Sequence, residues 1–187
     1  TLWEEGREEE AMGLFQKMRR LSPLDFYSRA FLAQHYLENG APEHAEEPLL
    51  EALALEPESA ELQELHLNFL LQWGNRRTRE GDFIGASANY REALMGDPDN
   101  VGLHFNLGYV YMQMDEFEAA SRHLLEYTEE RPEDFNGWVL LGDVAWSDQR
   151  YSQAQKWWRK ALIVARSMGN AGQIVAALEE RLEREIP

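Results

Sequence analysis

A repeating column of small residues restricts the fold of this chain more than any other feature. Alanine recurs at the same place in five successive segments, at intervals of 34, 41, 34 and 34 residues: Ala11, Ala45, Ala86, Ala120 and Ala154. Four residues after each alanine stands a large apolar residue: Phe15, Leu49, Tyr90, Leu124 and Trp158. A period of this length indicates stacked copies of one supersecondary unit, none of which can bury its apolar face alone.

Two further columns show that each unit is a pair of helices. Twelve residues before the alanines come small residues: Ala33, Gly74, Gly108 and Gly142. Twelve residues after the first four alanines comes a proline, which stops a helix: Pro23, Pro57, Pro98 and Pro132. The second residue after each proline suits a helix N-cap: Asp25, Ser59, Asn100 and Asp134. The columns therefore predict two antiparallel helices per unit, packed closely at the small residues.

These columns resemble the tetratricopeptide repeat, whose motif is W-x2-L-G-x2-Y, then A-x3-F, then P. Residues 101–134 carry Leu107, Gly108, Tyr111, Ala120, Leu124 and Pro132 in the expected places. Residues 135–168 carry Trp138, Leu141, Gly142, Ala154 and Trp158, but have Ala145 for the tyrosine and Arg166 for the proline. The resemblance implies an all-α, right-handed superhelical solenoid of antiparallel helix hairpins.

We expect one domain over residues 1–187. It comprises a half repeat at 1–25, repeats at 26–59, 60–100, 101–134 and 135–168, and a capping helix at 169–187. The last segment has apolar residues at helical spacing (Ile174, Ala177, Leu178 and Leu182) and charges on its other face. It suits a cap on the last repeat, although a partner-binding helix would show the same pattern. In the half repeat, Leu2 and Trp3 need cover, either from repeats upstream or from self-association.

The repeat is irregular in two places. The interval of 41 in place of 34 adds seven residues, Ala60–His66, or almost two helical turns, which keeps the helix phase within about 20°. We expect one long helix from about Ala60 to Arg79; a short separate helix with a kink is the alternative. Pro48 lies well inside the second helix of residues 26–59, where it predicts a bend.

Composition and motifs argue against catalysis and against binding of metal, cofactor or nucleic acid. The net charge of -16 opposes binding to nucleic acid or anionic lipid. Cysteine is absent, and the five histidines form no metal-ligand motif: His35, His44, His66, His104 and His123. No glycine-rich phosphate loop or nucleophile elbow is found. We expect a protein without catalytic residues, metal or cofactor, and therefore not an enzyme.

No apolar run approaches the roughly 20 residues that span a bilayer, so we expect no direct membrane insertion. A chain without cysteine suits either redox compartment, and its location is therefore open. We expect a soluble protein and favour the cytoplasm.

The resemblance implies that the first helix of each repeat lines a concave face. Its groove positions would be Tyr27, Ala30, Gln34 and Leu37; then Asn68, Leu71, Asn75 and Thr78; then Phe105, Tyr109 and Met112; and then Asn136, Val139, Asp143 and Trp146. From these and two neighbours we select a candidate partner-binding site: Asn75, Arg79, Phe105, Asn106, Tyr109, Met112, Asn136 and Trp146. The alternative is that the large apolar members only pack between repeats.

Two polar features bear on the partner. Asn75 and Asn106 match the asparagines with which some members of this family bind a C-terminal carboxylate, but Leu71, Asn136 and Leu140 stand nearer the places of the basic residues. We therefore do not expect such a clamp. Arginines at 76, 77 and 79 form the densest positive patch. Neighbouring acids such as Glu80 and Asp82 neutralise it, or it recognises an acidic or phosphorylated segment.

We therefore expect a scaffold or adaptor whose groove binds a peptide or helical segment of another protein. Two alternatives remain open. The chain is a regulatory or substrate-presenting segment of a larger enzyme, or a repeat module whose function is self-assembly.

Overall fold

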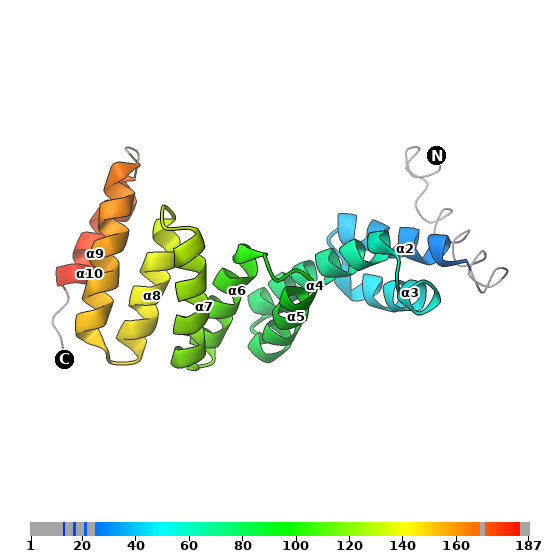
Figure 1. The fold of residues 1–187 in the computed structure, drawn as a ribbon, viewed down its shortest axis with the longest axis horizontal. Helices are drawn as coiled ribbons and strands as arrows, with labels where there is room; N and C mark the ends of the chain where they lie inside the picture. Colours follow the sequence, from blue (N-terminus) through cyan, green and yellow to red (C-terminus); the bar gives the residue numbers. More distant parts are fainter. Residues whose placement is uncertain (1–12, 14–16, 18–20, 22–24, 169–170, 184–187) are drawn as a thin grey trace. The chain divides into compact units, whose positions relative to one another are not determined.

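The computed structural model describes residues 13, 17, 21, 25–168 and 171–183, and every structural statement below concerns these residues. Their regular structure is α-helical, which confirms the all-α fold (Figure 1). The helices are α2 (Phe26–Glu38), α3 (Pro42–Leu55), α4 (Ala60–Glu80), α5 (Phe83–Gly96), α6 (Val101–Gln113), α7 (Phe117–Glu130), α8 (Phe135–Ser147), α9 (Tyr151–Ser167) and α10 (Gly172–Glu183). Most of the half repeat, including Leu2 and Trp3, lies outside the described residues, so self-association through it stays a prediction.

The described chain forms two compact units, with the boundary between Arg79 and Glu80 at the end of α4. The first contains the α2–α3 hairpin and α4. The second contains α5, the hairpins α6–α7 and α8–α9, and α10, and Figure 1 shows α6, α7, α8 and α9 standing side by side. The single domain over 1–187 stays a prediction.

The small and large columns pack as predicted. Ala120, Ala154, Leu124 and Trp158 are fully buried in the second unit. A Cβ atom on Gly108 would lie 2.7 Å from Leu124 Cδ2, and one on Gly142 would lie 2.9 Å from Trp158 Cγ. Because neither distance leaves room for a methyl group, each glycine lets the large residue of the next helix contact its backbone.

Three of the four predicted N-caps are confirmed. Asp25 Oδ1 accepts from the backbone N–H of Tyr27 at 3.1 Å, and Asp134 Oδ1 accepts from that of Asn136 at 2.9 Å. Ser59 Oγ accepts from the N–H of Leu62 at 3.5 Å.

Asn100 precedes α6 as expected, but the prediction that its side chain caps this helix is wrong. Its side chain makes no bond to the first turn, and Asn100 Nδ2 instead donates to Asp97 Oδ2 at 3.0 Å. This bond uses the NH2 end of the side chain, and Oδ1, the atom that would accept at an N-cap, makes no hydrogen bond to the first turn.

Helix α4 is continuous from Ala60 to Glu80, which confirms the long-helix prediction over the kinked alternative. Helix α3 likewise runs through Pro48, whose side chain is buried. The bend expected at Pro48 stays a prediction.

Helix α10 covers the last repeat, as predicted for a cap. Leu178 is buried, and Ile174 and Leu182 pack against the core of the second unit. Two ion pairs fasten its polar side: Arg166 Nη2 to Glu179 Oε1 at 2.6 Å, and Arg181 Nε to Asp143 Oδ1 at 3.3 Å.

Candidate functional site

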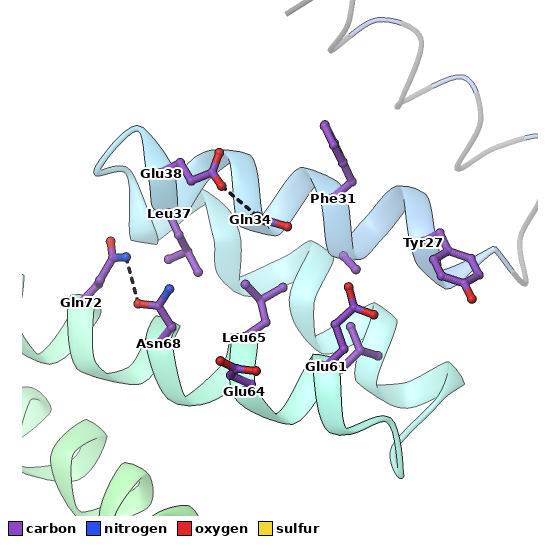
Figure 2. A pocket seen from close by; sticks show the side chains of 12 residues that line it. Tyr27, Phe31, Gln34, Leu37, Glu38, Glu61, Glu64, Leu65, Asn68 and Gln72 are labelled. Carbon is purple, nitrogen blue, oxygen red and sulfur yellow. Dashed lines mark hydrogen bonds between the residues drawn. The ribbon is translucent and has the colours of Figure 1, made fainter. Parts of the chain in front are cut away.

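A hollow of about 570 Å³ lies between α2 and α4 in the first unit (Figure 2). Helix α2 contributes Tyr27, Ala30, Phe31, Gln34, Leu37 and Glu38, and α4 contributes Glu61, Leu62, Glu64, Leu65, Asn68 and Gln72. Each set repeats at three- and four-residue spacing, so it falls on one face of its helix. Both helices are the first helices of their repeats.

The lining of the hollow overlaps the predicted groove positions and includes further residues. All four groove positions of α2 line it, and so does Asn68 of α4. Four further residues come from the extra turns of α4, which were predicted as helix but not as part of the groove: Glu61, Leu62, Glu64 and Leu65. The only feature of the sequence that indicated these residues was the interval of 41 in place of 34 residues, which marks the extra turns.

The lining combines apolar, amide and acidic groups. Leu37 and Leu62 are buried, whereas Tyr27 is 68% exposed and Phe31 is 44% exposed. Within the lining, Gln34 Nε2 donates to Glu38 Oε1 at 2.8 Å, and Gln72 Nε2 donates to Asn68 Oδ1 at 3.1 Å (Figure 2). Amide side chains have donors and acceptors that can pair with an extended peptide backbone.

Two predicted site residues, Asn75 and Arg79, lie on α4 outside this lining. Both are exposed, and Arg79 Nε donates to the Asn75 carbonyl oxygen at 3.3 Å. The arginines beside them are engaged within the first unit. Arg76 Nη1 pairs with Glu43 Oε2 at 2.6 Å, and Arg77 lies 4.7 Å from the ring centre of Trp73. Glu43 neutralises Arg76, whereas the contact of Arg77 with Trp73 leaves its charge in place, so the role of the patch stays open.

The other predicted site residues belong to the second unit, where α6 carries Phe105, Asn106, Tyr109 and Met112. Phe105 and Met112 are half-buried against the core, and the Phe105 ring lies 5.1 Å from that of Tyr127. Asn106 is also half-buried. Tyr109 is 38% exposed and is the most exposed of the four.

Helix α8 carries the last two, Asn136 and Trp146. Trp146 is half-buried, with its ring 4.8 Å from Tyr151 and 5.3 Å from Trp158. Asn136 is exposed, and its Nδ2 donates to Asp134 Oδ1 at 2.8 Å. Trp146 therefore has a packing role whether or not it also contacts a partner.

Asp143, another groove position, joins three helices of the second unit. Its Oδ1 accepts from Trp158 Nε1 of α9 at 3.0 Å and from Arg181 Nε of α10 at 3.3 Å. Burial of the indole requires such an acceptor. Asp143 therefore holds the cap and the last hairpin together.

Two titratable side chains have shifted pKa values. Burial and the proximity of His104, whose Nδ1 is 3.3 Å away, lower the pKa of His123 from its usual value. Burial and a short hydrogen bond to Asp134 raise the pKa of Tyr127 to about 12. Among the described residues, no group of three or more histidine or carboxylate side chains could hold a metal ion. The same part of the chain has no helix with the length and hydropathy of a membrane span.

Comparison with known proteins identifies the repeat. A tetratricopeptide-repeat family model matches residues 2–68 and 77–143. The human protein O-mannosyl-transferase TMTC3 is 27% identical over 191 residues, which cover 97% of this chain but only 20% of that protein. The chain thus spans about a fifth of this relative's length.

Solved structures share the fold at low identity. The crystal structure of MamA protein has a TM-score of 0.66 and 18% identity, over 90% of this chain and 88% of that chain. The TPR2AB domain of yeast Sti1 in its pHSP90 complex has a TM-score of 0.58 and 14% identity, over 98% of this chain and 82% of that chain.

Proposed function

Because this chain belongs to the tetratricopeptide-repeat family, we propose that it is a scaffold or adaptor that binds a segment of a partner protein on the first helices of its repeats. The observation that carries the proposal is the hollow between α2 and α4. It is concave, it has apolar side chains beside amide groups, and it is built from the helix faces that the repeat pattern assigns to the groove. Such surfaces bind extended or helical segments. The function is binding, without catalysis.

The pHSP90 complex of the Sti1 domain supports this proposal, since that complex pairs a domain of the same fold with a protein partner. The hollow is the primary surface in the first unit, with Asn75 and Arg79 further along α4. In the second unit, Phe105, Asn106, Tyr109, Met112, Asn136 and Trp146 form a separate candidate surface. Tyr109 is its best single probe, because replacing Phe105 or Trp146 would also disturb packing.

Site-specific photo-crosslinking tests the location. p-Benzoylphenylalanine is placed at Gln34 in the hollow or at Leu50, which is exposed on α3 and does not line it. In extract of the source cells, we expect a crosslinked protein from position 34. Excess unlabelled wild-type chain should suppress it, and excess Leu65→Arg chain should not. Equal yields from positions 34 and 50, or equal suppression by both competitors, would contradict the proposal.

A second candidate function is that of a regulatory or substrate-presenting segment of a larger enzyme. It is favoured by the match of 97% of this chain to 20% of a protein named as an O-mannosyl-transferase. The complete reading frame distinguishes the two candidates. A catalytic domain in the same polypeptide supports the second, and its absence supports an independent adaptor.

A further inference from the structure

The extra turns of α4 give the hollow a wall that a regular repeat would lack. Four of its twelve lining residues fall within the seven-residue extension: Glu61, Leu62, Glu64 and Leu65. Figure 2 shows Glu61, Glu64 and Leu65 on this part of α4, with Phe31 and Gln34 on α2. A third of the lining therefore lies outside the columns of the regular repeat.

The charge of the lining has one sign. Its charged residues are Glu38, Glu61 and Glu64, all exposed, and the lining contains no lysine, arginine or histidine. Glu38 accepts a hydrogen bond from Gln34, and Glu61 and Glu64 have no ion pair or hydrogen bond among the described residues. Carboxylates around a concave apolar surface focus a negative potential into it.

We infer that the hollow binds a positively charged amphipathic segment of the partner protein, and this inference rests on the proposed function. Lysine or arginine side chains of the segment would pair with Glu61 and Glu64. Its apolar side chains would contact Leu65, Phe31 and Tyr27. An acidic or phosphorylated segment would meet repulsion from three carboxylates in a chain whose net charge is -16.

Three synthetic helical peptides of equal length test the inference by fluorescence anisotropy. They have leucines at the same positions, and lysine, glutamine or glutamate at the others. We expect the lysine peptide to bind about tenfold more tightly than the glutamine peptide, and the glutamate peptide most weakly. The affinity of the lysine peptide should fall as salt is added, because the charges that contribute to its binding are exposed.

Charge-neutralising variants test whether the preference for the lysine peptide arises from the carboxylates of the hollow. Glu61→Gln with Glu64→Gln should weaken the lysine peptide by about tenfold and leave the glutamine peptide unchanged. The matched control, Glu129→Gln with Glu180→Gln, removes the same charge from exposed positions on α7 and α10. It should change the affinity by less than about twofold, since exposed charges outside the lining are screened by salt. Circular dichroism confirms that both variants remain folded.

The outcomes separate this inference from the proposed function. If both variant pairs weaken the lysine peptide equally, or neither does, the inference is wrong. If lysine and glutamine peptides bind equally and Leu65→Arg abolishes both, the hollow binds segments without selecting positive charge. Binding that is insensitive to Leu65→Arg contradicts the hollow as the site and so contradicts both proposals.

Discussion

At the scale of single residues, two glycines determine how closely the paired helices of the second unit approach. Gly108 faces Leu124, and Gly142 faces the indole of Trp158. The indole is fully buried and is held by its hydrogen bond to Asp143, so it cannot move aside without losing an interaction. The close approach therefore depends on the absence of a side chain at position 142.

Gly142→Ala should lower the free energy of unfolding by about 1–3 kcal/mol through overpacking against Trp158. Urea denaturation followed by circular dichroism measures the change. Gly102→Ala is the matched control, because its Cβ atom would meet only Asn100 Oδ1, at 3.5 Å. That variant should be neutral or more stable by up to about 1 kcal/mol from helix propensity. Equal effects of the two substitutions would contradict the packing account.

His123 makes stability depend on pH. It is partly buried, lies beside His104 and Arg122, and stacks on Tyr111 with 5.6 Å between the ring centres. Glu126 opposes the resulting fall of the pKa but does not reverse it. Because the folded-state pKa of His123 lies below 6.5, the usual value of a histidine side chain, the unfolded chain takes up a proton first as pH falls. The contribution of His123 is therefore complete above pH 6.5 and decreases below it.

We expect the melting temperature to fall between about pH 7.5 and pH 5.5, and His123→Gln to reduce that fall. Nuclear magnetic resonance titration of the imidazole provides the direct check. Its midpoint in the folded protein should lie below the midpoint in urea. A folded-state midpoint at or above the unfolded one would contradict the sign of the shift.

At the scale of helices, the repeat columns were sufficient to predict the hairpins and the long α4. The N-cap at Ser59 and the lack of proline or glycine through Trp73 indicated one uninterrupted helix. The wall that its extra turns form beside α2 was not predicted. Residues 60–66 have no counterpart in the regular repeat, so no column indicated which side chains they present to a neighbour.

The role of Asp143 was also beyond the repeat pattern. Spacing placed it in the groove, whereas Trp158 and Arg181 both donate to it. Arg181 lies 38 residues away in a helix outside the repeats. A buried tryptophan needs an acceptor for its N–H, and that was the one available signal. This requirement did not identify Asp143 as the acceptor for the Trp158 N–H.

The capping helix depends on one buried anchor. Leu178 is 1% exposed and belongs to the core of the second unit, so Leu178→Ala should cost about 2–5 kcal/mol of unfolding free energy. Glu180→Ala, two residues further along the same helix and exposed, should stay within about 0.5 kcal/mol. Urea denaturation of both variants compares them. A small effect at Leu178 would show that α10 does not stabilise the repeats.

At the scale of the whole molecule, each of the two compact units carries a candidate binding surface on the first helices of its repeats. The sequence predicted the type of surface, since first-helix positions line the hollow. The predicted site centres on Asn75, Phe105, Asn106, Tyr109, Met112 and Trp146, none of which lines the hollow between α2 and the start of α4, and that site stays a prediction. The prediction favoured the second unit because its groove positions carry large apolar and aromatic residues. Three of these side chains pack against the core: Phe105, Met112 and Trp146.

The central claim is that the first-helix face holds the partner, and one comparison of dissociation constants tests it directly. The partner segment recovered by crosslinking is titrated against Leu65→Arg and against Ile163→Arg, which makes the same change at a 70% exposed position on α9. We predict that Leu65→Arg weakens binding by at least about tenfold and that Ile163→Arg changes it by less than about twofold. Equal losses, or a larger loss at Ile163, would contradict the claim.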